Sequence, residues 1–140
     1  MLVLGRKQVE SVIKELFMLA SNAQYECMIK SLSDMLDRSD IVGYAAARNY
    51  RKISDCLTEF NDKKEKLLEK YGVKETDSEG NFTGNISINP TNPNYDIFMD
   101  SYNLYANIEH DVEIFKIKYD KVIGVLTGSE ILEIDWMLED

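Results

Sequence analysis

The stretch AARNYRKISDCLTEFNDKKEKLLEKY, residues 46–71, decides how this chain is expected to fold. Its positions at alternating intervals of four and three residues keep one side of an α-helix facing one partner. Those positions are Ala46, Tyr50, Ile53, Leu57, Phe60, Lys64, Leu67 and Tyr71. Asp40 can cap the start, and Gly72 stands where a helix commonly ends. The sequence therefore predicts one long helix over residues 41–72.

Two shorter helices are expected before the long one. Apolar residues from Val9 to Ala20 recur at helical spacing, which predicts a helix over about 6–20. A second apolar stripe predicts a helix over about 22–37, with Ser21 or Asn22 ending the first helix or capping this one. A single bent helix over both stretches is the alternative.

Turn-forming residues dominate the next segment, 73–94. Both prolines of the chain lie there among Gly, Asn, Asp, Ser and Thr, which is the composition of a loop. Phe82 and the alternation at Ile86–Ile88 indicate a short strand within it. We interpret the segment as a loop or hairpin insert, after which Pro93 opens a helix over about 93–109.

The segment VEIFKIKY, residues 112–119, supports two interpretations. It is rich in β-formers and begins with a strand-like alternation, which predicts a strand that pairs with residues 82–88 in an antiparallel ribbon. The alternation slips at Phe115, however, and helical spacing continues as far as Val122. The alternative is therefore an all-α fold, with the 93–109 helix continuing to about 123.

The last segment carries the clearest helix start in the chain. Thr127 and Glu130 stand at the spacing of a capping box. Leu126 can pack on Ile131 as a hydrophobic staple. A helix this short is not stable alone, so its apolar face must dock on the rest of the protein, and Trp136 is the expected anchor.

These segments together predict a mainly α single domain over residues 1–140. It is a helical bundle built on one long helix, with a small two-stranded antiparallel β element. Its parts are N-terminal helices at 1–40, the long helix at 41–72, the insert at 73–94 and a helix–strand–helix unit at 95–140. A hydrophobic content of 44% over 140 residues suffices for one core. The two cysteines are expected to be free thiols, which favours a reducing compartment.

The excess negative charge lies in the second half of the chain. Residues 1–72 hold 12 Lys or Arg and 11 Asp or Glu, whereas residues 73–140 hold 4 Lys and 14 Asp or Glu. An acidic surface repels nucleic-acid phosphates and membrane anions, and attracts a basic protein surface. We therefore expect no direct contact with nucleic acid or membrane. Solubility alone is the other explanation of this charge.

Candidate catalytic, cofactor and metal-binding residues form no recognisable pattern. His110 is the only histidine, which excludes multi-histidine metal sites and leaves one imidazole for any nucleophilic triad. Residues 77–81 depart from the EF-hand pattern, and scattered surface acids are far commoner than an acid–base pair. We expect no enzyme activity, no cofactor and no metal.

Tyrosines and acids in the second half supply the candidate binding residues. Tyrosine is favoured at interfaces because it offers contact area at low entropic cost, although it is also an ordinary residue at the edge of a core. The candidates for partner binding are Tyr102, Tyr105, Glu109, Asp111 and Glu113.

Three features of residues 41–140 carry a family resemblance. They are the basic helix end FNDKKEKLLEKYG, the acidic insert followed by a helix and VEIFKIKY, and the closing LTGSEILEIDWMLED. In these features the chain resembles an uncharacterised family of small proteins from phages and prophages of Gram-positive bacteria, catalogued as a domain of unknown function. The resemblance implies a phage protein that works in the bacterial host cytoplasm, and it brings no catalytic residues.

The expected function is that of a non-enzymatic phage accessory protein acting by protein–protein contact. An inhibitor of a host defence or nucleic-acid enzyme is its most concrete form, because the acidic half could occupy a basic groove. The expected partner is a host or phage protein with a basic surface, with a homo-oligomer as a further possibility. The alternative is a virion or assembly component of a phage.

Overall fold

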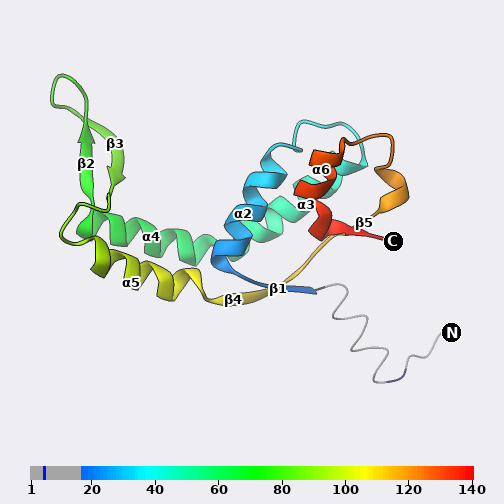
Figure 1. The fold of residues 1–140 in the computed structure, drawn as a ribbon, viewed down its shortest axis with the longest axis horizontal. Helices are drawn as coiled ribbons and strands as arrows, with labels where there is room; N and C mark the ends of the chain where they lie inside the picture. Colours follow the sequence, from blue (N-terminus) through cyan, green and yellow to red (C-terminus); the bar gives the residue numbers. More distant parts are fainter. Residues whose placement is uncertain (1–4, 6–16) are drawn as a thin grey trace. The chain divides into compact units, whose positions relative to one another are not determined.

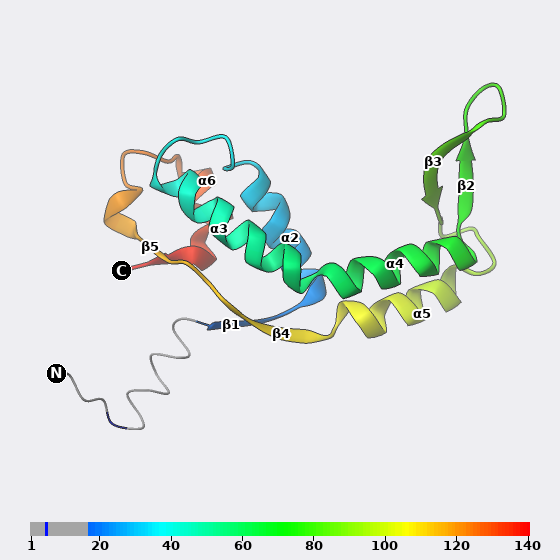
Figure 2. The same ribbon diagram turned by 180° about the vertical axis from the view of Figure 1, so that it is seen from behind.

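The structure, a computed structural model, describes Gly5 and residues 17–140 of the chain. Within these residues lie five α-helices and six short strands, and the strands form three two-stranded sheets (Figure 1; Figure 2). The chain divides into two units. Unit 1 combines the residues up to Leu57 with Glu109–Asp140, whereas unit 2 is the continuous segment Thr58–Ile108.

Two capped helices pack against each other in unit 1. The hydroxyl of Ser21 accepts a hydrogen bond from the Gln24 N–H and so caps α2 (Asn22–Ser33). A carboxylate oxygen of Asp40 accepts from the Gly43 N–H at the start of α3 (Ile41–Cys56). The buried side chains between and beside the two helices include Leu32, Met35, Val42, Ala45, Ala46 and Ile53.

An antiparallel ribbon in unit 1 joins β1 (Phe17–Ser21) to β4 (Glu109–Glu113). The buried Tyr25 holds both strands, since its Oη lies 2.5 Å from the Met18 carbonyl oxygen and 2.9 Å from that of His110. Burial raises the pKa of this hydroxyl to about 12, with a smaller contribution from Cys56. The phenol therefore stays protonated and donates to the ribbon.

The end of the chain completes the core of unit 1. Here β5 (Ile117–Lys118) runs parallel to β6 (Leu138–Glu139), and between them lie two 3₁₀ turns, Tyr119–Lys121 and Asp135–Met137, and α6 (Gly128–Glu133). The buried side chains of this last segment are Ile117, Val122, Leu126, Ile134, Met137 and Leu138.

A buried amide holds the chain between β4 and β5. Asn49 of α3 donates from Nδ2 to the Phe115 carbonyl oxygen at 3.0 Å and accepts at Oδ1 from the Phe115 N–H at 2.7 Å. These are the two bonds that a neighbouring strand would make, so one side chain satisfies both backbone groups of Phe115, which belongs to no sheet.

Unit 2 is a helical hairpin that carries a β-hairpin at one end. α4 (Thr58–Tyr71) packs against α5 (Tyr95–Ala106), and β2 (Val73–Thr76) pairs with β3 (Phe82–Ser87) between them in sequence. Gly72 joins α4 to β2 where a Cβ would lie only 2.6 Å from Cγ2 of Ile86 and from the Leu68 carbonyl oxygen. That close approach requires glycine.

The prediction of a mainly α bundle built on one long helix is wrong. The segment 41–72 forms two helices, and Leu57 is the C-cap at which α3 ends. The Leu57 N–H reaches the Ser54 carbonyl oxygen, three residues earlier, as well as that of Ile53, so the last turn is tightened. With ψ at −3°, Leu57 departs from helical geometry and α4 starts anew at Thr58. The apolar spacing continues across the break and so gave no sign of it. With three sheets beside the helices, the fold is mixed α/β.

The predicted strand pairing is also wrong. Residues 82–88 pair with β2 next to them in sequence, whereas β4 pairs with β1. Residues 17–20, expected at the end of a helix over 6–20, therefore belong to a strand, and the remainder of that helix, 6–16, lies outside the described residues. A strand needs backbone partners, and local sequence does not show which segment will supply them.

The other predicted elements hold in part. The strand interpretation of 112–119 is confirmed over β4 and β5, and the slip in alternation at Phe115 falls where the chain leaves the ribbon. The capping box at Thr127 is confirmed, but α6 ends at Glu133. Trp136 is only half-buried and donates from Nε1 to the Glu133 carbonyl oxygen, so Met137 is the anchor in its place.

Candidate interaction surface

Three acids line one side of the β1–β4 ribbon. Alternate residues of a strand point to the same face, so Glu109, Asp111 and Glu113 share one side of β4, and all three are exposed. The residues between them turn the other way, where Val112 is buried and His110 is half-buried.

Apolar side chains from β1 stand opposite these acids. Leu19 pairs in register with Asp111 and is 61% exposed, and Phe17 pairs with Glu113 and is also exposed. Residues directly opposite on an antiparallel ribbon have neighbouring side chains. We call this surface the ribbon face and define it by Phe17, Leu19, Glu109, Asp111 and Glu113.

The ribbon face is negative. Neither strand contains Lys or Arg. Among residues 17–140, Lys52 of α3 is the one cation within ion-pair distance of these acids, with its Nζ 3.8 Å from Oε2 of Glu113. Glu109 and Asp111 thus keep their charge available to a partner. The surface can combine apolar contact with attraction for a basic group.

The two candidate tyrosines lie in unit 2, whereas the three acids belong to unit 1. The ring of Tyr102 stacks on that of Phe98 with the centroids 6.0 Å apart, and its centroid lies 5.7 Å from that of the Phe60 ring. Tyr105 is half-buried with Nζ of Lys63 5.9 Å from its ring centroid. Both tyrosines therefore contribute to the packing of α4 on α5. The structure groups the three acids on one face of unit 1, whereas both tyrosines belong to unit 2.

Other reactive groups are scattered. Cys27 is exposed on α2, whereas Cys56 is half-buried, which raises the pKa of its thiol. In the part of the chain that the structure describes, no group of three His, Cys, Asp or Glu is arranged to hold a metal ion. Within the same residues, no helix has both the length and the apolar character needed to cross a bilayer.

Sequence reasoning missed Phe17 and Leu19 as surface residues. No signal in the sequence marked them, because all four residues of Phe17–Ala20 are apolar and only the structure shows exposed and inward-facing side chains in alternation. A run of four apolar residues fits a helix equally well, and the helical spacing from Val9 onward favoured that interpretation.

Known proteins supply no functional argument for this chain, so the argument rests on the surfaces described above. Searches against protein-family models, curated proteins and solved structures find no match. The resemblance to a phage family stays a prediction.

Proposed function

We propose that this protein is a non-enzymatic binding protein that docks a basic surface of a partner protein onto the ribbon face. The observation that carries the proposal is the register of the ribbon, which sets exposed Leu19 opposite exposed Asp111 and exposed Phe17 opposite Glu113. Apolar side chains at the centre of an interface supply contact area, and the acids around them speed association and select a partner of opposite charge.

The family resemblance supports a more specific form of this proposal. In that form the protein is a phage-encoded accessory protein in the cytoplasm of a bacterial host, where it inhibits a defence or nucleic-acid enzyme. Enzymes that hold nucleic acid present basic grooves to the phosphate backbone, and an acidic ribbon with apolar contacts is complementary to such a groove.

Paired charge reversal on the ribbon tests the proposal. Glu109→Lys with Asp111→Lys changes the ribbon face, and Asp34→Lys with Asp55→Lys is the matched control, since both control acids are also exposed in unit 1. Each protein is used to capture partners from lysate of infected cells. We expect a basic protein that the unaltered chain and the control retain and that the ribbon variant loses. Its binding should also weaken as salt rises, because exposed charges are screened over ~8–10 Å near physiological ionic strength.

Three outcomes count against the proposal. Equal capture by all three proteins would remove the ribbon face from the interface. An affinity for the partner that does not change with salt would show that the charge of the ribbon face does not contribute to binding. Capsid or tail proteins as the main partners would favour a virion or assembly component in place of an inhibitor.

A further inference from the structure

Helix α5 of unit 2 has two apolar faces, and only one of them is covered by α4. Phe98 and Ala106 are buried, and the Phe98 ring stacks with Tyr102 against Phe60 of α4. This inner face accounts for the packing of the helical hairpin. It does not account for the remaining large apolar residues of α5.

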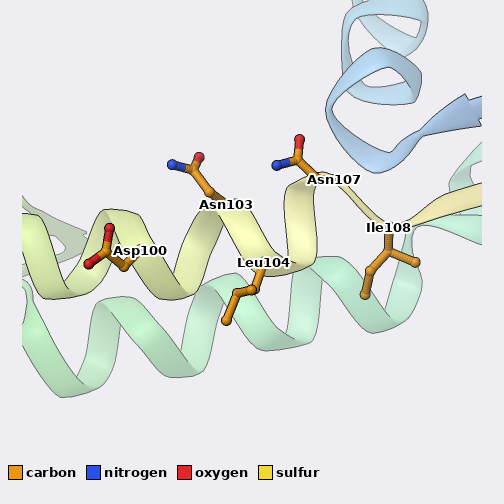
Figure 3. A pocket seen from close by; sticks show the side chains of 5 residues that line it. All are labelled: Asp100, Asn103, Leu104, Asn107 and Ile108. Atoms are coloured by element: carbon orange, nitrogen blue, oxygen red, sulfur yellow. The ribbon is translucent and has the colours of Figure 1, made fainter.

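The other face of α5 exposes a second apolar stripe. Leu104 is 73% exposed, and Ile97, seven residues earlier on the same side of the helix, is also exposed. Ile108 is exposed as well and lies just beyond the end of α5 at Ala106. A shallow hollow lies on the same helix, lined by Asp100, Asn103, Leu104, Asn107 and Ile108. Figure 3 shows Leu104 and Ile108 pointing to one side of α5 and the amides of Asn103 and Asn107 to another. We call the five lining residues with Ile97 the outer face of α5.

The charge on α5 indicates what can cover this face. The helix carries Asp96 and Asp100 and contains no Lys or Arg. A partner with Lys or Arg beside its own apolar residues would gain both burial and charge attraction here, whereas an acidic partner would be repelled. The amides of Asn103 and Asn107 add donors and acceptors that can be satisfied by polar side chains.

We propose that the outer face of α5 is a docking site for one amphipathic helix of a partner protein, with Lys or Arg flanking its apolar stripe. Ile97 and Leu104 lie about 10 Å apart along α5, which matches two turns of such a helix, and Ile108 follows just beyond the end of α5. Helix-against-helix recognition through apolar anchors spaced along one face is a recurrent mode of peptide binding. The proposal shares with the ribbon face only the basic character of the partner, and otherwise does not rest on it.

A synthetic peptide can probe the site without knowledge of the natural partner. The probe is a labelled helical peptide of about 20 residues, long enough to be partly helical alone, with Leu at helical spacing and Lys on the flanks. A second peptide keeps every Leu and replaces each Lys by Glu. Fluorescence anisotropy with the full chain measures the dissociation constant of each peptide at two salt concentrations.

Three variants locate the binding. Leu104→Gln with Ile108→Gln removes the anchors of the outer face. Leu132→Gln is the matched control, because Leu132 lies on α6 of unit 1 and is 78% exposed. The third variant is Asp111→Lys with Glu113→Lys on the ribbon face, which leaves Glu109 next to Ile108 unchanged. We expect the Lys peptide to bind, the anchor variant to weaken it by about tenfold or more, and the other two variants to leave it nearly unchanged.

Four results would overturn the inference. They are failure of the Lys peptide to bind, equal binding of the Glu peptide, loss of binding in the ribbon variant with the anchor variant unaffected, and a dimer of the unaltered chain that the anchor variant abolishes. The third result would move the helix site to the ribbon face and leave the proposed function standing. The opposite result is also distinguishable. If only the anchor variant loses the peptide, and the ribbon variant still captures the partner from lysate, the proposed function is wrong and the helix site stands.

Discussion

The two units of this protein bury their large apolar residues to different extents. Among its described residues, unit 1 buries 14 large apolar side chains, including Tyr25, Leu32, Ile53, Val122, Ile134 and Met137, and exposes eight. Unit 2, which the structure describes in full, buries Phe60, Phe98 and Ala106 and leaves five large apolar side chains exposed. These five are Val73, Phe82, Ile97, Leu104 and Ile108.

The difference follows from how each unit is assembled. Unit 1 brings together segments from both ends of the described chain, so each element has partners on more than one side. Unit 2 is one helical hairpin with a β-hairpin, and a two-layer arrangement of this size covers only one face of each element. We infer that unit 1 supplies most of the stability, and that unit 2 retains surface for binding.

The largest effect should come from removing the end of unit 1. A chain that stops before Thr127 loses Ile134, Met137 and Leu138 from the buried core. We expect it to aggregate or to become a molten state, because the opposing core residues would be left facing water. Near-ultraviolet circular dichroism, dye binding and sedimentation would measure this. A soluble product with cooperative melting would show that unit 1 does not need these buried residues in order to fold.

A matched pair of truncations to alanine should separate the units. Ile53→Ala removes a fully buried side chain of unit 1 and should lower the free energy of unfolding by about 2–5 kcal/mol. Leu104→Ala removes a side chain that is mostly exposed on unit 2 and should change it by no more than about 0.5 kcal/mol. Denaturant unfolding of both variants tests the claim. A large loss with Leu104→Ala would mean that its face is already packed.

Tyr25 should make the stability of unit 1 depend on pH. Its folded pKa is raised from 10.0 to about 12, so the folded state holds the proton more tightly than the unfolded state. The contribution is fully present below pH 10, and it is lost as the pH rises toward 12, by on the order of 2 kcal/mol.

The measurement compares the unaltered chain with Tyr25→Phe in denaturant melts across this range. Other tyrosines and lysines titrate there in both proteins, so the informative quantity is the difference between the two curves. We expect Tyr25→Phe to be less stable at neutral pH and to lose less stability on alkalinisation. Parallel curves would show that the phenol is not held in the ribbon.

The smallest effect should come from the β-hairpin of unit 2. Every residue of β2, and all but Ile86 in β3, is exposed, and an isolated two-stranded hairpin is marginally stable. Native-state hydrogen exchange should therefore give backbone amides of β2 and β3 much lower opening free energies than those of α3. Lys74→Ala, which removes a cation 5.2 Å from the Phe82 ring centroid, should leave the midpoint of thermal unfolding nearly unchanged. Protection of the hairpin equal to that of α3 would show that it is packed in solution.

The candidate site was only partly accessible from sequence. Intervals of two residues place Glu109, Asp111 and Glu113 on one face of a strand, and the structure shows that this segment is a strand. The contribution of Leu19 was not visible, because β1 lies about 90 residues earlier in the chain and its register is set by the Tyr25 hydrogen bonds and the burial of Ala20 and Val112. The sequence offered Tyr102 as a candidate for partner binding, but it could not show that the ring stacks on Phe98 within unit 2.

Local chemistry in the sequence determined where α2, α3 and α6 begin and which face of α3 is buried. The caps at Ser21, Asp40 and Thr127 act within three residues, and the apolar spacing from Ala46 to Phe60 marks side chains that are buried or half-buried in the structure. Tertiary structure alone decided the strand partners, the break at Leu57 and the pairing of the Asn49 amide with the Phe115 backbone. The physical reason is that a cap is satisfied by its own neighbours, whereas a strand or a buried amide is satisfied by whichever distant segment the packing brings within hydrogen-bond distance.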